Sequence, residues 1–168
     1  MDKKDKVRRE DAVKVRKLLF VCLGNICRSP AAEGVMAHMV REAGMEREFV
    51  IDSAGIGGWH IGQLPDSRMR ERGRLRGYRF DSRARQISRR DFDDFDMILV
   101  MDGDNYRAVT SLAPDERARR KVRMLVDFLP EGEAVAAVPD PYYGGISDFD
   151  YALTLVEKAC GGLLKAVL

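Results

Sequence analysis

Residues 22–30 read CLGNICRSP, and this stretch determines how the segments on either side of it are interpreted. The apolar run 18–21 precedes the stretch, and a segment with apolar residues at helical spacing follows it. A loop that leads from a buried strand into a helix turns its backbone N–H groups inward and forms a cradle for an anion. Cys22 stands at the mouth of this loop, and Arg28 adds a planar fork that fits two oxygens of a tetrahedral oxyanion.

The cysteine and the arginine of this loop together predict phosphoryl transfer. The electropositive setting favours the thiolate form of Cys22, which is the nucleophilic form. Arg28 is expected to bind the phosphoryl oxygens and to stabilise the charge of the transition state. Asn25 suits left-handed backbone geometry, and Ser29 can cap the following helix and donate to the thiolate. The residues expected to bind phosphate are Leu23, Gly24, Asn25, Ile26, Cys27 and Ser29.

Strand and helix patterns alternate along the rest of the chain. Strands are expected at residues 14–21, 49–53, 97–101 and 122–125, and helices at 30–43, 66–76, 88–94, 104–112, 114–119 and from 148 to the end. The alternation predicts an α/β fold: a four-stranded parallel sheet with helices on both faces and the phosphate-binding loop after the first strand. Ligands of such folds bind beyond the carboxyl ends of the strands, where Cys22 is expected to lie.

The loop and several further motifs resemble the low-molecular-weight protein tyrosine phosphatase family, over almost the whole span from residue 17 to residue 168. The further motifs are Asp52-Ser53-Ala54-Gly55, Trp59-His60-Ile61-Gly62, Ala84-Arg85-Gln86, Met101-Asp102 with Asn105, and Asp140-Pro141-Tyr142-Tyr143-Gly144. The resemblance implies an enzyme, a phosphoric monoester hydrolase that cleaves phosphotyrosine through a cysteinyl-phosphate intermediate on Cys22.

The resemblance also implies roles for several side chains. Asp140, which lies between two prolines, would protonate the departing oxygen and then activate water. Asp102 stands at the end of the third predicted strand and is expected to support the site. Asn25 would hold the loop through a hydrogen bond with Ser53. Family members often have a histidine where this chain has Ser82, and this departure affects the network around Asn25.

Aromatic residues are expected to shape the substrate cleft. By resemblance, Trp59, Tyr142 and Tyr143 form its walls, and an aromatic slot selects a flat aryl phosphate over a short aliphatic one. Cys27 has two interpretations of equal weight: by resemblance, a partner for a reversible, redox-regulated disulfide with Cys22, or a small packed residue. His60, like His38, is expected to be structural.

Composition sets the broad class. The chain has 168 residues, 45% of them hydrophobic and 33% charged, as expected for one globular core. We expect a mobile charged tail at residues 1–13 and a single phosphatase domain at residues 14–168. Because the chain has no apolar run of membrane-spanning length and no signal-peptide pattern, we expect a cytoplasmic protein that binds neither membranes nor nucleic acid. Three cysteines and two histidines without zinc-site spacing predict no metal and no cofactor.

An arginine-rich segment offers a hint about partners. Residues 68–90 hold ten arginines against two acidic residues. This segment could attract acidic phosphopeptides, although a solvated surface is the simpler interpretation. The expected partners are tyrosine-phosphorylated proteins, with the tyrosine-rich tail of a kinase as one candidate. We expect a monomer or a weak dimer.

Three other functions compete with phosphotyrosine hydrolysis. A phosphoarginine phosphatase would use the same fold, but such family members tend to have threonine where this chain has Ile26. An arsenate reductase also uses a Cys-Xaa5-Arg loop, but it relays oxidation to further cysteines on a mobile segment, and the segment after Arg79 has none. A module that binds phosphotyrosine without turnover should lack the nucleophile or the acid.

Overall fold

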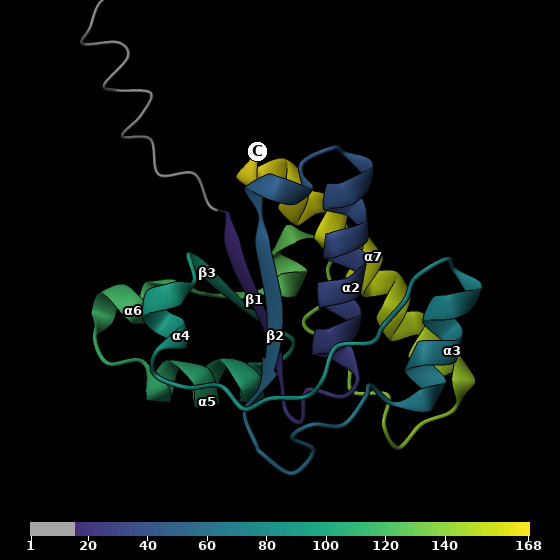
Figure 1. Ribbon diagram of the computed structural model, residues 1–168, viewed down its shortest axis with the longest axis horizontal. Helices are drawn as coiled ribbons and strands as arrows, with labels where there is room; N and C mark the ends of the chain where they lie inside the picture. Colours follow the sequence, from purple (N-terminus) through teal and green to yellow (C-terminus); the bar gives the residue numbers. More distant parts are fainter. Residues whose placement is uncertain (1–15) are drawn as a thin grey trace, which may run out of the picture.

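A four-stranded parallel sheet lies at the centre of the computed structural model, which describes residues 16–168 (Figure 1). The strands are β1 (Lys17–Cys22), β2 (Val50–Gly55), β3 (Met97–Val100) and β4 (Val122–Met124). Their order in the sheet is β2-β1-β3-β4, and all three pairings are parallel. The α/β fold predicted from the alternation of patterns is confirmed.

Helices cover both faces of the sheet (Figure 1). On one side are α2 (Arg28–Glu42) and α7 (Ile146–Val167), with α3 (Ser67–Leu75) beside α7. On the other side are α4 (Asp91–Asp94), α5 (Gly103–Leu112) and α6 (Glu116–Arg120). Two short 3-10 turns, Glu46–Glu48 and Leu125–Phe128, were not expected from the sequence.

Strand β1 is buried on both faces, which fixes the position of its last residue. Leu18 and Phe20 belong to the core shared with α2 and α7, while Leu19 and Val21 belong to the core under α4, α5 and α6. All four side chains are fully buried. Because successive side chains of a strand point to opposite faces, a continuous apolar run is what a strand between two helical layers requires. Cys22 therefore sits at the end of a strand that is buried on both faces.

Two helix starts differ from the sequence-based expectation. Helix α2 begins at Arg28 with Cys27 at its N-cap and no capping side chain, so the prediction that Ser29 caps this helix was wrong. Helix α7 begins at Ile146, two residues before the predicted start. Asp148 lies inside its first turn, where Oδ2 accepts a hydrogen bond from the Gly145 N–H at 2.8 Å. Asp148 was expected at the start of the helix. Its carboxylate instead lies in the first turn and accepts from the N-cap residue, so the predicted start was too late.

Other expectations from the sequence can be placed directly. One side of α7 is buried in the core through Phe149, Leu153, Val156, Cys160, Leu163 and Val167. The predicted tail at residues 1–13 and the first two residues of the predicted first strand lie outside the described residues. Within residues 16–168, no helix has the length and apolar character needed to span a membrane.

Candidate active site

The phosphate-binding loop occupies residues 23–27, between the end of β1 and the start of α2. Three of its carbonyl groups accept from backbone N–H groups: Leu23 from Gly57 at 2.9 Å, Ile26 from Asp66 at 2.6 Å and Cys27 from Ala31 at 3.3 Å. Among the backbone hydrogen bonds of the described residues outside helices and strands, none uses an N–H of residues 24–27 as donor. These amides remain available to the oxygens of an anion, as the sequence predicted for this loop.

The Cys22 sulfur lies against the hydroxyl of Ser29. The Sγ–Oγ distance is 2.9 Å, and both residues are buried. Asn25 Nδ2 donates to the same hydroxyl oxygen at 2.9 Å. Because the oxygen of Ser29 already accepts from Asn25, its hydrogen is free to donate to the sulfur, with the Ala54 carbonyl at 3.5 Å as the longer alternative. A hydroxyl that donates to a thiolate stabilises the negative charge.

Asn25 connects the loop to the strands beside it. Its φ of 57° is left-handed, as predicted from the residue type. Nδ2 also donates to Ser53 Oγ at 2.9 Å, so the hydrogen bond that the resemblance implied is present. Its Oδ1 accepts from the Arg85 backbone N–H at 3.0 Å. A Cβ atom on Gly55 would come within 3.1 Å of three atoms of the loop, so only glycine lets β2 approach this closely.

Arg28 is buried under the loop and is held by oxygens from distant parts of the chain. Its Nη1 donates to Asp102 Oδ2 at 2.7 Å and to the Val138 carbonyl at 2.9 Å. Burial by itself lowers the pKa of a guanidinium, but the charges of Cys22, Asp102 and Asp140 outweigh it and raise the pKa of Arg28 above its usual range. The side chain therefore stays cationic, and its orientation is fixed before any anion binds.

Asp140 reaches the same place from a loop more than a hundred residues further along the chain. Its Oδ2 lies 3.6 Å from Arg28 Nη2, and its Oδ1 accepts from the Tyr142 N–H at 3.1 Å. The segment before it is fixed to β3 because the Val138 N–H donates to the Met101 carbonyl at 2.8 Å. The Asp140 side chain keeps 40% of its surface exposed, which leaves it accessible to a substrate and to water.

A cavity of about 320 Å³ opens over the loop. Trp59, Tyr142 and Tyr143 form its outer walls, and their exposed fractions are 68%, 38% and 96%. The two tyrosine rings meet edge to face, with centroids 4.9 Å apart. The remaining lining residues are Cys22, Leu23, Gly24, Ile26, Cys27, Arg28, His60 and Asp140. The structure thus brings the predicted catalytic and aromatic residues and four of the six predicted loop residues to one cavity. The other two, Asn25 and Ser29, are buried and do not line it.

His60 also lines this cavity, although it was expected to be structural. Its Nδ1 lies 3.0 Å from Gln63 Oε1, which orients the ring. A Cβ atom added to Gly24 would lie 3.0 Å from the ring carbon Cδ2. The signal available in the sequence was its position directly after Trp59 in a glycine-rich loop.

Cys27 differs sharply from Cys22 in its surroundings. Its thiol is buried, and this burial, followed by the charge of Cys22, raises the pKa of Cys27 far above its usual range. Such a thiol stays protonated at neutral pH and is a poor nucleophile. Cys22, Cys27 and Cys160 all lie within the described residues, and all three are unpaired thiols.

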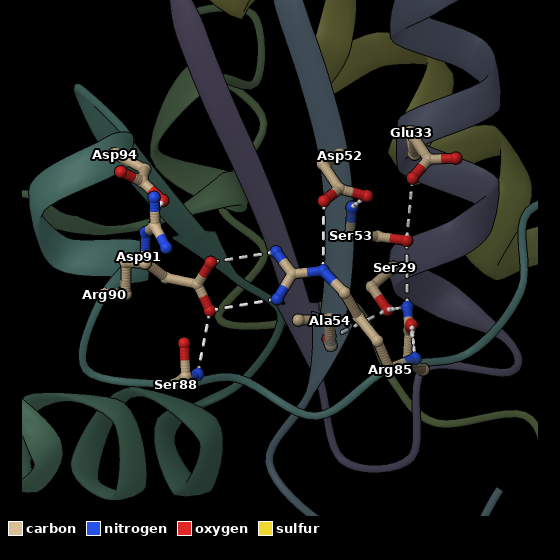
Figure 2. Close-up of polar contacts among 11 residues, drawn as sticks. Ser29, Glu33, Asp52, Ser53, Ala54, Arg85, Ser88, Arg90, Asp91 and Asp94 are labelled. Carbon is tan, nitrogen blue, oxygen red and sulfur yellow. Dashed lines mark hydrogen bonds and ion pairs between the residues drawn. The ribbon is translucent and has the colours of Figure 1, made fainter. Parts of the chain in front are cut away.

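Two residues of the site have no counterpart among the predicted site residues (Figure 2). Arg85 donates two hydrogen bonds to Asp91, at 2.9 and 3.0 Å, and a third to Asp52 at 3.0 Å. Glu33, one turn after Ser29 on α2, accepts from Ser53 Oγ at 3.0 Å. Arg85 stands within a motif quoted above, but Glu33 has no signal in the sequence beyond its place on the helix.

Most of the arginine-rich segment is neutralised by its surroundings. Within the described residues, seven of its ten arginines form ion pairs with carboxylates: Arg68, Arg72, Arg74, Arg76, Arg79, Arg85 and Arg90. Arg68 is one example, since it pairs with Asp66 and also donates to the Tyr142 carbonyl at 3.1 Å. The segment acts mainly as structure, which favours the simpler of the two interpretations of its charge.

Comparison with known proteins identifies the family. The model of the low molecular weight phosphotyrosine protein phosphatases matches residues 17–168. A relative from Synechocystis sp. is 50% identical over 151 residues, which cover 90% of this chain and 96% of the relative. The low molecular weight protein-tyrosine-phosphatase of Streptomyces coelicolor is 44% identical over 155 residues, 90% of this chain and 93% of the relative.

A solved structure agrees with these sequences. The crystal structure of a protein tyrosine phosphatase from Entamoeba histolytica superposes with a TM-score of 0.86 at 45% identity, covering 89% of this chain and 95% of that chain. The cavity over the loop, the parallel sheet and the sequence matches therefore lead to one assignment. This chain belongs to the low-molecular-weight phosphotyrosine protein phosphatase family and is a hydrolase of that class.

Proposed function

We propose that this enzyme hydrolyses phosphotyrosine in proteins through a cysteinyl-phosphate intermediate on Cys22. The observation that supports this most directly is that Cys22, Arg28 and Asp140 line one cavity, with Arg28 Nη2 3.6 Å from Asp140 Oδ2. A nucleophile, an anion binder and a proton donor are the three groups that the reaction needs.

In the first step, the Cys22 thiolate attacks phosphorus while the bond from phosphorus to the tyrosyl oxygen breaks. The protonated Asp140 carboxyl gives its proton to that oxygen, so tyrosine leaves as a neutral phenol. Arg28 and the free amides of residues 24–27 hold the equatorial oxygens, where charge is concentrated in the transition state. In the second step, the Asp140 carboxylate takes a proton from water, water oxygen attacks phosphorus, and the S–P bond breaks to restore the thiolate.

The walls of the cavity favour an aryl phosphate. Trp59, Tyr142 and Tyr143 offer flat surfaces beside the loop, and a phenyl ring can pack against them. Ile26 lines the cavity where phosphoarginine phosphatases tend to carry threonine, which favours tyrosine. A reductase relay is disfavoured because Cys160 is fully buried in the core of α7. A binding module without turnover is disfavoured because the nucleophile and the acid are both present.

The domain, the partners and the redox protection of the enzyme are part of the same proposal. We take residues 14–168 as one phosphatase domain that needs no metal or other cofactor. Its partners would be tyrosine-phosphorylated proteins of the cytoplasm, including the tail of a kinase, met by a monomer or a weak dimer. A reversible disulfide between Cys22 and Cys27 would protect the nucleophile under oxidation.

The experiment that tests this function compares phosphotyrosine and phosphoarginine peptides at mildly acidic and neutral pH, with Cys22→Ser as the blank. Cys22-dependent release of phosphate with a preference for phosphotyrosine is the expected result. A preference for phosphoarginine would keep the mechanism but overturn the substrate. Turnover of neither peptide would overturn the proposed activity.

A further inference from the structure

A chain of four hydrogen bonds runs from the carboxyl group of Glu33 to the nucleophile. Ser53 Oγ donates to Glu33 Oε1 at 3.0 Å and accepts from Asn25 Nδ2 at 2.9 Å. Asn25 Nδ2 uses its other hydrogen to donate to Ser29 Oγ at 2.9 Å, and that oxygen lies 2.9 Å from Cys22 Sγ. Figure 2 shows the Glu33 end of this chain, with Ser53 between Glu33 and the loop.

The Asn25 amide sets the direction of the hydrogen bonds in this chain. Its nitrogen can only donate, one hydrogen to Ser53 and one to Ser29, and its oxygen accepts from the Arg85 N–H. The hydroxyl hydrogen of Ser29 is left for the Cys22 sulfur. Glu33 takes the hydrogen of the Ser53 hydroxyl at the far end, so it holds the Ser53 oxygen in place as the acceptor for Asn25.

The surroundings of Glu33 favour a neutral carboxyl. It is largely buried against β2, and the charged group that faces it from that strand is Asp52, a second carboxylate. Asp52 is paired with Arg85 at 3.0 Å, whose guanidinium also binds Asp91 (Figure 2). From the segment after α3, Glu33 meets only the uncharged hydroxyl of Ser82. No cation from the described residues pairs with Glu33.

Burial is the largest cause that raises the pKa of Glu33, to about 7, and Asp52 adds to it, while hydrogen bonds from Ser53 and Ser82 act in the opposite direction. The group thus changes charge near neutral pH. An ionised Glu33 would place a negative charge in the same buried network as the thiolate and the bound phosphate. Like charges in a network of low dielectric disfavour one another.

We propose that Glu33 is a positioning residue of the phosphatase reaction: as a neutral carboxyl it holds the Ser53 hydroxyl that accepts from Asn25, and its ionisation weakens the thiolate and the binding of phosphate. The inference rests on the proposed function, because it needs Cys22 as the nucleophile. It goes beyond that function because it attributes the pH dependence of activity above neutral pH to Glu33, a residue that does not line the cavity.

The test compares Glu33→Gln and Glu33→Ala with the unmodified enzyme in hydrolysis of p-nitrophenyl phosphate from pH 5 to 8.5. Glutamine keeps an acceptor for Ser53 and a donor for Asp52, so it imitates the neutral carboxyl at every pH. Glu42→Gln is the matched control, because Glu42 is an exposed glutamate on the same helix. Cys22→Ser supplies the blank for hydrolysis. In the alkylation experiment it measures the reaction of the other two thiols, Cys27 and Cys160.

The expected result is a change in the shape of the pH profile. Glu33→Gln should match the unmodified enzyme within about twofold at pH 5.5 and exceed its kcat/KM by about three- to tenfold at pH 8, as a single like charge in a partly buried network predicts. Glu33→Ala should be slower by about tenfold at pH 5.5, because Ser53 loses its acceptor. Alkylation of Cys22 by iodoacetamide without substrate should follow the same order.

Two results would overturn the proposal, and both are distinct from failure of the proposed function. One is a Glu33→Gln profile that superimposes on that of the unmodified enzyme while Cys22-dependent activity is intact. The other is a carbon-13 NMR titration in which the Glu33 carboxyl ionises below pH 5. Absence of Cys22-dependent activity in the unmodified enzyme would overturn the function itself, and the proposal with it.

Discussion

The Nη1 atom of Arg28 lies 2.7 Å from the Oδ2 atom of Asp102. The other oxygen of Asp102 accepts from the Asn105 N–H at 2.7 Å and so caps helix α5. One carboxylate therefore fixes both the start of a helix and the guanidinium that is proposed to bind phosphate. The orientation of Arg28 depends on a residue more than seventy positions away in the sequence, because β1 and β3 are neighbours in the sheet.

Replacing Asp102 should weaken the chemistry more than the fold. Asp102→Asn keeps an oxygen for the cap of α5, but it removes the charge that holds Arg28. We expect kcat to fall by about 10- to 100-fold, since a small displacement of a positioning group costs this much. The measurement is steady-state hydrolysis of an aryl phosphate, with Asp104→Asn on the exposed side of the same helix as control. Equal kcat in both variants would contradict the role of Asp102.

Replacing the nucleophile should separate binding from turnover. Cys22→Ser should lower kcat by at least about 10⁴-fold, because a serine hydroxyl is far less nucleophilic than a thiolate. Affinity for inorganic phosphate should be retained, because Arg28 and the loop amides are unchanged. Calorimetric titration with phosphate and an activity assay measure the two quantities. Retained turnover would exclude Cys22 as the nucleophile.

The role of Asp140 should depend on the leaving group. Asp140→Asn should slow phenyl phosphate by about 10²- to 10⁴-fold, the usual contribution of a general acid. Aryl phosphates whose phenols are strong acids leave without a proton, so they should be affected much less in the first step. A series of substituted phenyl phosphates, read by the burst of phenol, gives the slope of rate against phenol pKa. A slope that does not change on substitution would remove Asp140 from proton transfer.

Trp59 should determine which phosphate ester the enzyme prefers rather than the rate of the chemical step. The side chain is 68% exposed at the rim of the cavity, so its removal leaves the core intact. Trp59→Ala should raise KM for an aryl phosphate by about 3- to 10-fold, the contribution of one aromatic contact, with little change for an alkyl phosphate. Tyr106→Ala, an exposed aromatic on α5, is the control. A parallel loss for both substrates would contradict recognition of the ring.

The titration of Glu33 also predicts how stability depends on pH. Its pKa in the folded protein is about 7 and its ordinary value is 4.5, so between these values the folded state binds a proton that the unfolded state lacks. Stability should therefore fall as pH rises from about 4.5 to 7, by up to about 3 kcal/mol from this residue. Chemical denaturation of the unmodified protein and of Glu33→Gln at pH 5 and pH 8 measures this. Glu33→Gln should lose less stability over that interval, and equal losses would contradict the raised pKa.

Contiguous segments could be interpreted correctly from sequence. The strand β1, the loop and the start of α2 follow one another without interruption, so the apolar run and the CLGNICRSP stretch predicted the place of Cys22 and the anion cradle. The left-handed backbone of Asn25 follows from its residue type. The prediction that Ser29 caps α2 was wrong because a serine near a helix start can serve either the backbone or a neighbouring group. Its predicted contact with the Cys22 sulfur is present at 2.9 Å.

The sequence alone determined the α/β fold, the phosphate-binding loop and the candidate nucleophile, because local order along the chain encodes all three. The tertiary structure decided how Asp102 holds Arg28, how Arg85 binds both Asp52 and Asp91, and why burial raises the pKa of Glu33. These properties depend on burial and on charges from several elements, so they exist only where the sheet and α2 bring those side chains together. No spacing in the sequence encodes a distance between two carboxylates on different elements.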